Sequence, residues 1–156
     1  MLENWHPQWT VVLGSMYAML LGGIIGFERE MKDRPAGFRT HMLVSGAAAL
    51  LVGLGPLILA DPAYQRGDNL LRLDPIRLVE ATITGVAFIG AGTIFSHRGK
   101  EQVAGITTAA SLLMVAVIGI TVAQRYYLLA LLVTLLTLGV LFGLSWIERR
   151  VRKDRA

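Results

Sequence analysis

The chain has 156 residues, of which 54% are hydrophobic and only 17% are charged, and its net charge is +4. An ordinary soluble domain carries roughly 25% charged residues, so this composition argues against a soluble enzyme or a nucleic-acid-binding domain. The length allows one domain at most. The chain contains no cysteine, which excludes disulfides and thiol ligands.

Five apolar segments follow one another, each long enough to cross about 30 Å of hydrocarbon as a helix. They are Trp9–Phe27, Thr40–Ala60, Pro75–Ser96, Gln102–Gln124 and Tyr126–Ile147. We therefore expect an all-α, polytopic membrane bundle of about five helices. Residues 1–147 are predicted to form a single transmembrane domain, and residues 148–156 a short basic tail.

The basic residues are distributed unevenly between the predicted loops. With five spans, the loops on one side carry 11 basic residues and those on the other side carry four. The positive-inside rule then places the N-terminus outside and the basic tail in the cytoplasm. The first span has no basic segment before it and no cleavage site close behind it, so we interpret it as a permanent span.

Small residues recur at helical spacing in the first and fifth segments. They are Gly14, Ala18, Gly22 and Gly26 in the first segment, and Gly139 and Gly143 in the fifth. Such residues let helix backbones approach closely in a membrane. We expect the first set to pack within the bundle, and the second to dock either within the bundle or between subunits.

The third segment begins with a polar motif. Asp74 followed by Pro75 is typical of a helix N-cap. Arg77 and Glu80 lie three residues apart on the expected helix and can pair there. They form either an interfacial ion pair or a polar site open to the outer side, since ionisable residues inside spans are functional candidates.

An internal repeat is present at an offset of 68 residues. Seven of the 31 positions from Gly22 to Val52 are identical to the residues 68 positions later. Gly37 and Thr40 match Gly105 and Thr108, for example. The first two spans therefore resemble the third and fourth in the same orientation, with the fifth appended. Parallel repeats of this kind occur in transporter-like folds.

The repeat brings two polar motifs to the predicted cytoplasmic side. The candidate residues are Glu28, Arg29, Glu30, Arg39, Thr40 and His41 in the first motif, and Thr107 and Thr108 in the second. Gly90 and Gly92, near the start of the second motif, are expected to serve helix packing.

Three interpretations of these motifs remain open. Glu28 and Arg39 can pair and hold the first two spans together. Two helix N-termini, together with Arg39 and His41, can bind an anion. Glu28, Glu30 and Asp33 can supply oxygen ligands to Mg²⁺. No nucleophile elbow, P-loop or zinc signature occurs, so we expect neither catalysis nor a cofactor.

The same motifs resemble a known family. The segments Gly26–Glu30 with Ala36–Val44, then Asp74–Arg77 with Gly85–Ile94, then Gly105–Leu112, are similar to the three signatures of the MgtC/SapB family. This resemblance implies a bacterial inner-membrane protein of four or five helices. Family members are associated with adaptation to low magnesium and, in pathogens, with survival inside macrophages. They are generally regarded as not being Mg²⁺ transporters themselves, and a regulatory role towards another membrane protein has been proposed for them.

Two features depart from the family pattern. Many members carry a C-terminal ACT-like soluble domain, whereas this chain ends nine residues after Ile147, so we expect a short form. Val86 and Ala87 stand where the family commonly has Ile and Gly. The expected function is non-enzymatic regulation of another integral membrane protein by a homo-oligomer in the lipid bilayer. The alternative is a small oligomeric transporter or channel for Mg²⁺ or protons.

Overall fold

Five helices make up the part of the chain that the computed structural model describes, residues 5–60, 74–95 and 105–153. They are α1 (Trp5–Met31), α2 (Phe38–Ala60), α4 (Pro75–Phe95), α5 (Ile106–Ala123) and α6 (Tyr127–Lys153). The predicted all-α bundle is confirmed. Ser96 and Gln102, the expected ends of the third and fourth spans, lie outside the described residues. Helix α6 continues past Ile147, so the expected boundary with the basic tail falls inside a helix.

The helices form a multi-pass membrane protein. Four of them, α1, α2, α4 and α5, are long and apolar enough to cross a membrane, and α6 is apolar over the 17 residues Tyr127–Gly143. Large apolar side chains cover the outside of the bundle, with Phe88 82% exposed and Leu136 70% exposed. Contiguous apolar surface of this extent is unfavourable in water and suits lipid.

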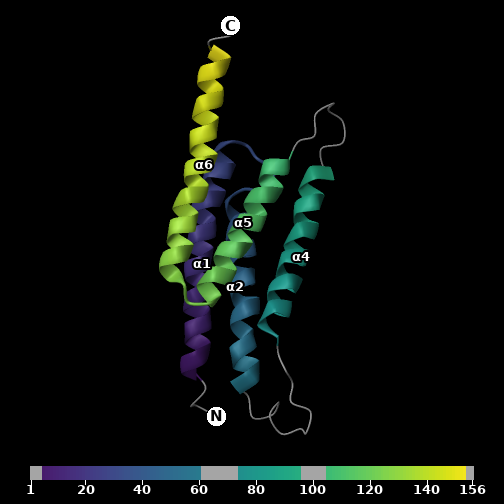
Figure 1. Ribbon diagram of the computed structural model, residues 1–156, viewed down its shortest axis with the longest axis vertical. Helices are drawn as coiled ribbons and strands as arrows, with labels where there is room; N and C mark the ends of the chain where they lie inside the picture. Colours follow the sequence, from purple (N-terminus) through teal and green to yellow (C-terminus); the bar gives the residue numbers. More distant parts are fainter. Residues whose placement is uncertain (1–4, 61–73, 96–104, 154–156) are drawn as a thin grey trace.

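The helices alternate in direction. Helices α1, α4 and α6 run one way and α2 and α5 the other (Figure 1). We call the end where α1, α4 and α6 begin the lower end, and the end where α2 and α5 begin the upper end. Helix α5 is central, since it contacts all four other helices, whereas α4 lies at the edge and touches only α5 and α2 (Figure 1).

Glycines of α1 bring its backbone against α2. A Cβ atom on Gly22 would lie 2.6 Å from the His41 carbonyl oxygen, and one on Gly26 would lie 2.8 Å from the Phe38 Cα. The small residues of the first span therefore pack within the bundle, as predicted. By contrast, nothing lies within 4 Å of a Cβ placed on Gly139 or Gly143, so neither glycine of that pair is packed among the described residues.

The packing supports the internal repeat. In the first half, Gly22 of α1 faces His41 of α2. In the second half, Gly90 of α4 faces Ala109 of α5, with 3.3 Å between its added Cβ and the alanine Cβ. Both residues of the second contact lie 68 positions after their counterparts. The two helix pairs therefore use equivalent positions for close approach.

Candidate functional site

Charged side chains are buried near the upper end of the bundle, where α1 ends. Glu28 is 2% exposed and Arg29 is 3% exposed. The Arg29 Nε donates a hydrogen bond to Glu28 Oε2 at 2.5 Å, and Lys32, one helical turn further on, forms an ion pair with Glu28 Oε1. A buried carboxylate is tolerated only when cations and hydrogen bonds compensate for its lost hydration. Arg29 at the end of α1 and Lys32 just after it do so here.

The expected pair between Glu28 and Arg39 does not form. His41 is fully buried, and successive residues of an α-helix are about 100° apart. Arg39, two residues earlier on α2, therefore points away from the core and is exposed. Arg29 and Lys32 reach Glu28 instead.

Lys32 also links α1 to α6. Its Nζ donates a hydrogen bond to the Leu141 carbonyl oxygen at 3.0 Å and lies 5.2 Å from the centre of the Phe142 ring. The second contact is a cation–π interaction. One ammonium group thus neutralises a buried carboxylate and holds the fifth helix to the first.

A second polar contact joins α2 to α5. His41 Nδ1 lies 2.9 Å from the Gly37 carbonyl oxygen, and His41 Nε2 lies 2.9 Å from Ser111 Oγ. The carbonyl can only accept, so it places a proton on Nδ1. Ser111 Oγ also lies 2.8 Å from the Thr108 carbonyl oxygen. Its hydroxyl proton can therefore go either to that carbonyl or to His41 Nε2.

A serine hydroxyl beside a histidine is the chemistry of an activated nucleophile. Here, however, His41 is fully buried and Ser111 is 3% exposed. The arrangement joins helices without offering the hydroxyl to a substrate.

The two helices that start at the upper end begin differently. Glu30 Oε2 accepts a hydrogen bond from the Phe38 backbone N–H at 2.7 Å, which caps the first turn of α2. Gly105 precedes α5 with φ of 94° and makes no side-chain capping bond. Of the candidate threonines near these helix starts, Thr40 is half-buried, Thr107 is exposed and Thr108 is buried.

The carboxylates proposed as Mg²⁺ ligands do not converge. Among the residues that the structure describes, no group of three or more His, Asp or Glu side chains is placed to hold a metal ion. Glu28 is engaged by two cations and Glu30 by a backbone N–H. The acidic residues of this motif therefore serve as ion-pair and capping partners.

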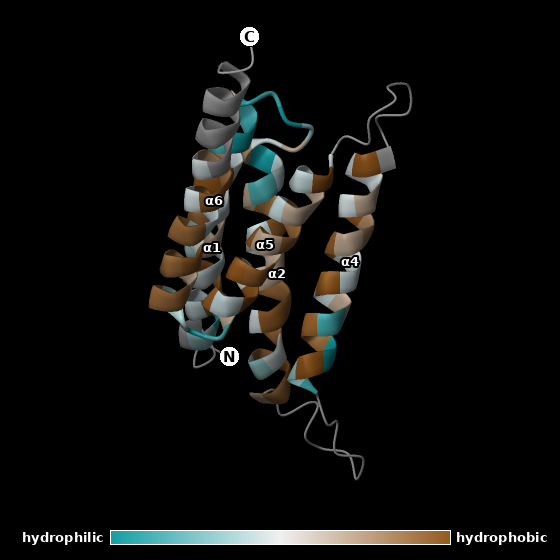
Figure 2. Ribbon diagram, turned by 45° about the horizontal axis from the view of Figure 1, so that its top comes forward, coloured by the Kyte–Doolittle hydropathy of each residue, from teal (hydrophilic) through white to brown (hydrophobic). Residues whose placement is uncertain are grey.

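The polar motif of α4 lies at the lower end (Figure 2). Asp74 Oδ1 accepts a hydrogen bond from the Ile76 N–H at 2.9 Å, so the predicted N-cap is confirmed. Arg77 and Glu80 are both exposed and do not pair with each other. With Asp74 and Thr84 they line a shallow, open pocket.

Sequence reasoning missed several residues of the buried network. Ser111 is a hydroxyl in an otherwise apolar span, and Lys32 follows Glu28 at the spacing of a helical ion pair. These two sequence features were sufficient to identify Ser111 and Lys32 as candidate residues. Gly119 is different, because only the fold shows that its backbone lies against Ser45 and Ala48 of α2.

Comparison with known proteins adds the evolutionary context. The sequence model of the MgtC family matches residues 16–150. An uncharacterized protein of Haemophilus influenzae is 32% identical over 156 residues, covering 96% of this chain and 64% of that protein. Protein SapB of Bacillus subtilis is 31% identical over 156 residues, covering 99% and 65%. The putative magnesium transporter YhiD of Escherichia coli is 34% identical over 130 residues, covering 83% and 58%.

The chain thus spans about three fifths of the length of these relatives. No solved structure is significantly similar to it.

Proposed function

This chain belongs to the MgtC family, and from that premise we propose that it is a non-enzymatic membrane protein that regulates another integral membrane protein during adaptation to low magnesium or a related stress. The observation that carries this proposal is the outward face of α4. Only 17% of the residues in the α4 span are buried, compared with 50% in α5.

The two faces of α4 differ in burial. Val86 and Thr82 are buried against the bundle. The opposite face is exposed and comprises Arg77, Glu80, Ala81, Thr84, Gly85, Phe88 and Gly92, which we call the α4 outer face. Nothing lies within 4 Å of a Cβ placed on Gly85 or Gly92. Small residues and hydroxyls are what membrane helices use to associate.

Charge makes lipid a poor neighbour for the lower part of this face, whereas Phe88 further along it suits lipid. A charged side chain facing the centre of the hydrocarbon costs about 2.5–3.5 kcal/mol, and less near the interface. Arg77 and Glu80 lie in the first two turns of α4 and do not neutralise each other. A polar partner helix would remove part of this cost for both residues. The buried charges at the upper end, in contrast, already have partners in the chain.

A photo-crosslinking experiment tests this assignment. A photoreactive amino acid is placed at Thr84, and in a matched control at Leu136, which is 70% exposed on α6. In cells grown at low magnesium, we expect the Thr84 position to crosslink to one defined integral membrane protein. The additional change Glu80→Gln should reduce that product. The Leu136 position should not give it.

The outcomes separate the alternatives. Crosslinking only to a second copy of the chain would replace the regulatory partner by a homo-oligomer. Identical products at Thr84 and Leu136, or no protein product at Thr84, would contradict the docking role of the α4 outer face.

Transport is the second candidate, supported by the name of one relative, a putative magnesium transporter of Escherichia coli. Its test is flux into liposomes that contain the purified chain and a Mg²⁺-sensitive or pH-sensitive dye. Saturable flux that is lost in Glu80→Gln would favour a transporter over a regulator. Absence of flux from folded, inserted protein would favour the regulator.

The proposed location is the bacterial inner membrane, with the N-terminus outside and the upper end in the cytoplasm. The excess of basic residues in the loops of one side supports this orientation. Green fluorescent protein fused to the C-terminus should fluoresce if that terminus is cytoplasmic. A dark but stable fusion would reverse the orientation.

A further inference from the structure

A cavity of about 130 Å³ lies near the lower end of the bundle, between α1, α2 and the turn that joins α5 to α6. It exists because the helices differ in length. Helix α5 has 18 residues, whereas α1 has 27 and α2 has 23. The α5–α6 turn therefore stops short of the lower ends of α1 and α2 (Figure 1). The start of α6 closes one side, where Tyr17 and Tyr127 pack edge to face at 5.9 Å.

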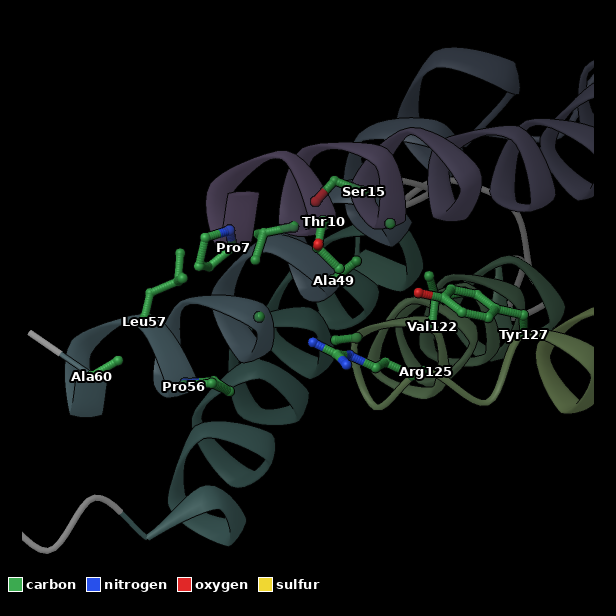
Figure 3. Close-up of a pocket in the computed structure, with 14 residues that line it drawn as sticks. Pro7, Thr10, Ser15, Ala49, Pro56, Leu57, Ala60, Val122, Arg125 and Tyr127 are labelled. Atoms are coloured by element: carbon green, nitrogen blue, oxygen red, sulfur yellow. The ribbon is translucent and has the colours of Figure 1, made fainter. Parts of the chain in front are cut away.

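The walls of the cavity are mostly apolar, and a few polar side chains also line it. Arg125 extends from the turn with its guanidinium group directed toward α2, while Thr10 and Ser15 lie on the α1 wall (Figure 3). Within the part of the chain that the structure describes, no carboxylate pairs with the Arg125 guanidinium. Ser15 is 8% exposed, and its buried Oγ has no hydrogen-bond partner among those residues. The guanidinium of the exposed residue Arg125 and an unsatisfied, buried hydroxyl thus line the same partly open cavity.

The backbone of Arg125 gives an independent reason to consider this residue. The Arg125 N–H donates to the Val122 carbonyl at 2.8 Å and the Tyr126 N–H donates to the Thr121 carbonyl at 3.1 Å. This pair of bonds is a Schellman motif, whose residue in the left-handed conformation is usually glycine. Arg125 occupies that position with φ of 65°. A strained non-glycine residue at such a site is a reason to look for a function of its side chain.

The helix dipoles at this end of the bundle favour neither an anionic nor a cationic ligand. The starts of α1 and α6 and the ends of α2 and α5 all lie toward this end of the bundle. Positive and negative helix ends therefore oppose one another. The guanidinium is left as the main fixed charge of the cavity. With its five N–H donors, it favours a planar or tetrahedral oxyanion, which it can bind through two parallel hydrogen bonds.

We infer that this cavity binds a phosphate group, held by the Arg125 guanidinium and the Ser15 hydroxyl. The volume corresponds to about four water molecules at roughly 30 Å³ each, which is sufficient for a group of this size. The span of α1 begins at Pro7 and that of α2 ends at Ala60, and both residues line the cavity. It therefore opens at the depth of lipid headgroups. The phosphate comes either from a phospholipid or from solution. This inference is independent of the proposed docking role of α4.

The test uses the purified full chain in detergent. Thermal unfolding and native mass spectrometry are followed while inorganic phosphate, or short-chain phosphatidylglycerol below its micellar concentration, is added at constant ionic strength. We expect a saturable rise in the melting temperature of the wild type. The Arg125→Gln change should weaken binding by about tenfold or more, as expected for loss of a charge-assisted hydrogen-bond pair. Ser15→Ala should weaken it less.

Two further variants keep the result interpretable. Arg125→Gly relieves the left-handed backbone, so it should fold at least as well as Arg125→Gln and still fail to bind. Arg34→Gln removes the same charge from an exposed residue beyond the opposite end of α1 and should bind normally. Binding of inorganic phosphate identifies the soluble anion as a ligand, and binding of the lipid alone identifies the headgroup. Binding that is equal in wild type and Arg125→Gln, or no binding of either probe, would overturn the inference.

Discussion

Replacing Gly22 by alanine tests whether backbone contact between α1 and α2 holds the buried polar network in place. The added Cβ would lie 2.6 Å from the His41 carbonyl oxygen and 2.7 Å from the Ser45 Cβ. Both neighbours belong to the opposing helix, one of them to its backbone, so neither can rotate away. Ordinary contact begins near 3.4 Å, and the two helices must therefore separate by several tenths of an ångström.

The expected cost follows from two opposing effects. Overpacking of this kind destabilises a core by about 1–3 kcal/mol, while alanine is favoured over glycine inside a helix by about 1 kcal/mol. Because neither neighbour can rotate away, we expect the upper part of the overpacking range, about 2–3 kcal/mol, and a net loss of about 1–2 kcal/mol for Gly22→Ala. This corresponds to a melting temperature lower by about 2–8 °C for a chain of this size.

Gly139→Ala supplies the matched control, because nothing lies within 4 Å of the Cβ that it adds. It should be neutral or slightly stabilising. Thermal unfolding of the two variants in the same detergent compares them directly. Equal melting temperatures for Gly22→Ala and Gly139→Ala would refute the close packing of α1 on α2.

Three further predictions concern the hydrogen bonds and ion pairs of the described residues. Glu28→Gln should lower the free energy of unfolding by about 3 kcal/mol, because it removes the carboxylate that neutralises the buried Arg29 and the partly buried Lys32. Glu30→Gln keeps its capping acceptor and should cost much less. Similar losses for the two variants in SDS-induced unfolding would contradict this. A double-mutant cycle of His41→Ala and Ser111→Ala should give a coupling of about 1 kcal/mol, and strictly additive losses would mean that the hydrogen bond contributes nothing. Asp74→Ala should cost about 1 kcal/mol while Asp74→Asn retains the cap, so equal stability of these two variants would count against capping of α4.

The candidate site shows where sequence reasoning reached its limit. Asp74 was identifiable as an N-cap because capping depends on a residue and its immediate neighbours. The partner of Glu28 was misassigned, since the choice between Arg39 and Lys32 depends on which way each side chain points once α2 has docked. The bond from His41 to Ser111 joins residues 70 positions apart, and no local pattern specifies such a distance.

The proposed phosphate cavity was even less predictable from the sequence. In the sequence, Arg125 is an ordinary basic residue of a loop, and Ser15 is one of many hydroxyl residues in the spans. They meet only because α5 is shorter than its neighbours and the turn after it enters the left-handed region.

The sequence by itself determined the environment and the elements of this protein. Long apolar segments can be stable only as helices in lipid, because every backbone polar group must be satisfied within its own segment. The repeat at 68 residues further indicated that the first two spans resemble the third and fourth in the same orientation. The tertiary structure decided which charges are buried, which partners they find and which face of α4 stays uncovered. Those outcomes depend on how helices rotate and slide as they pack, and rotation of one helix by a single residue changes every side chain at its interface.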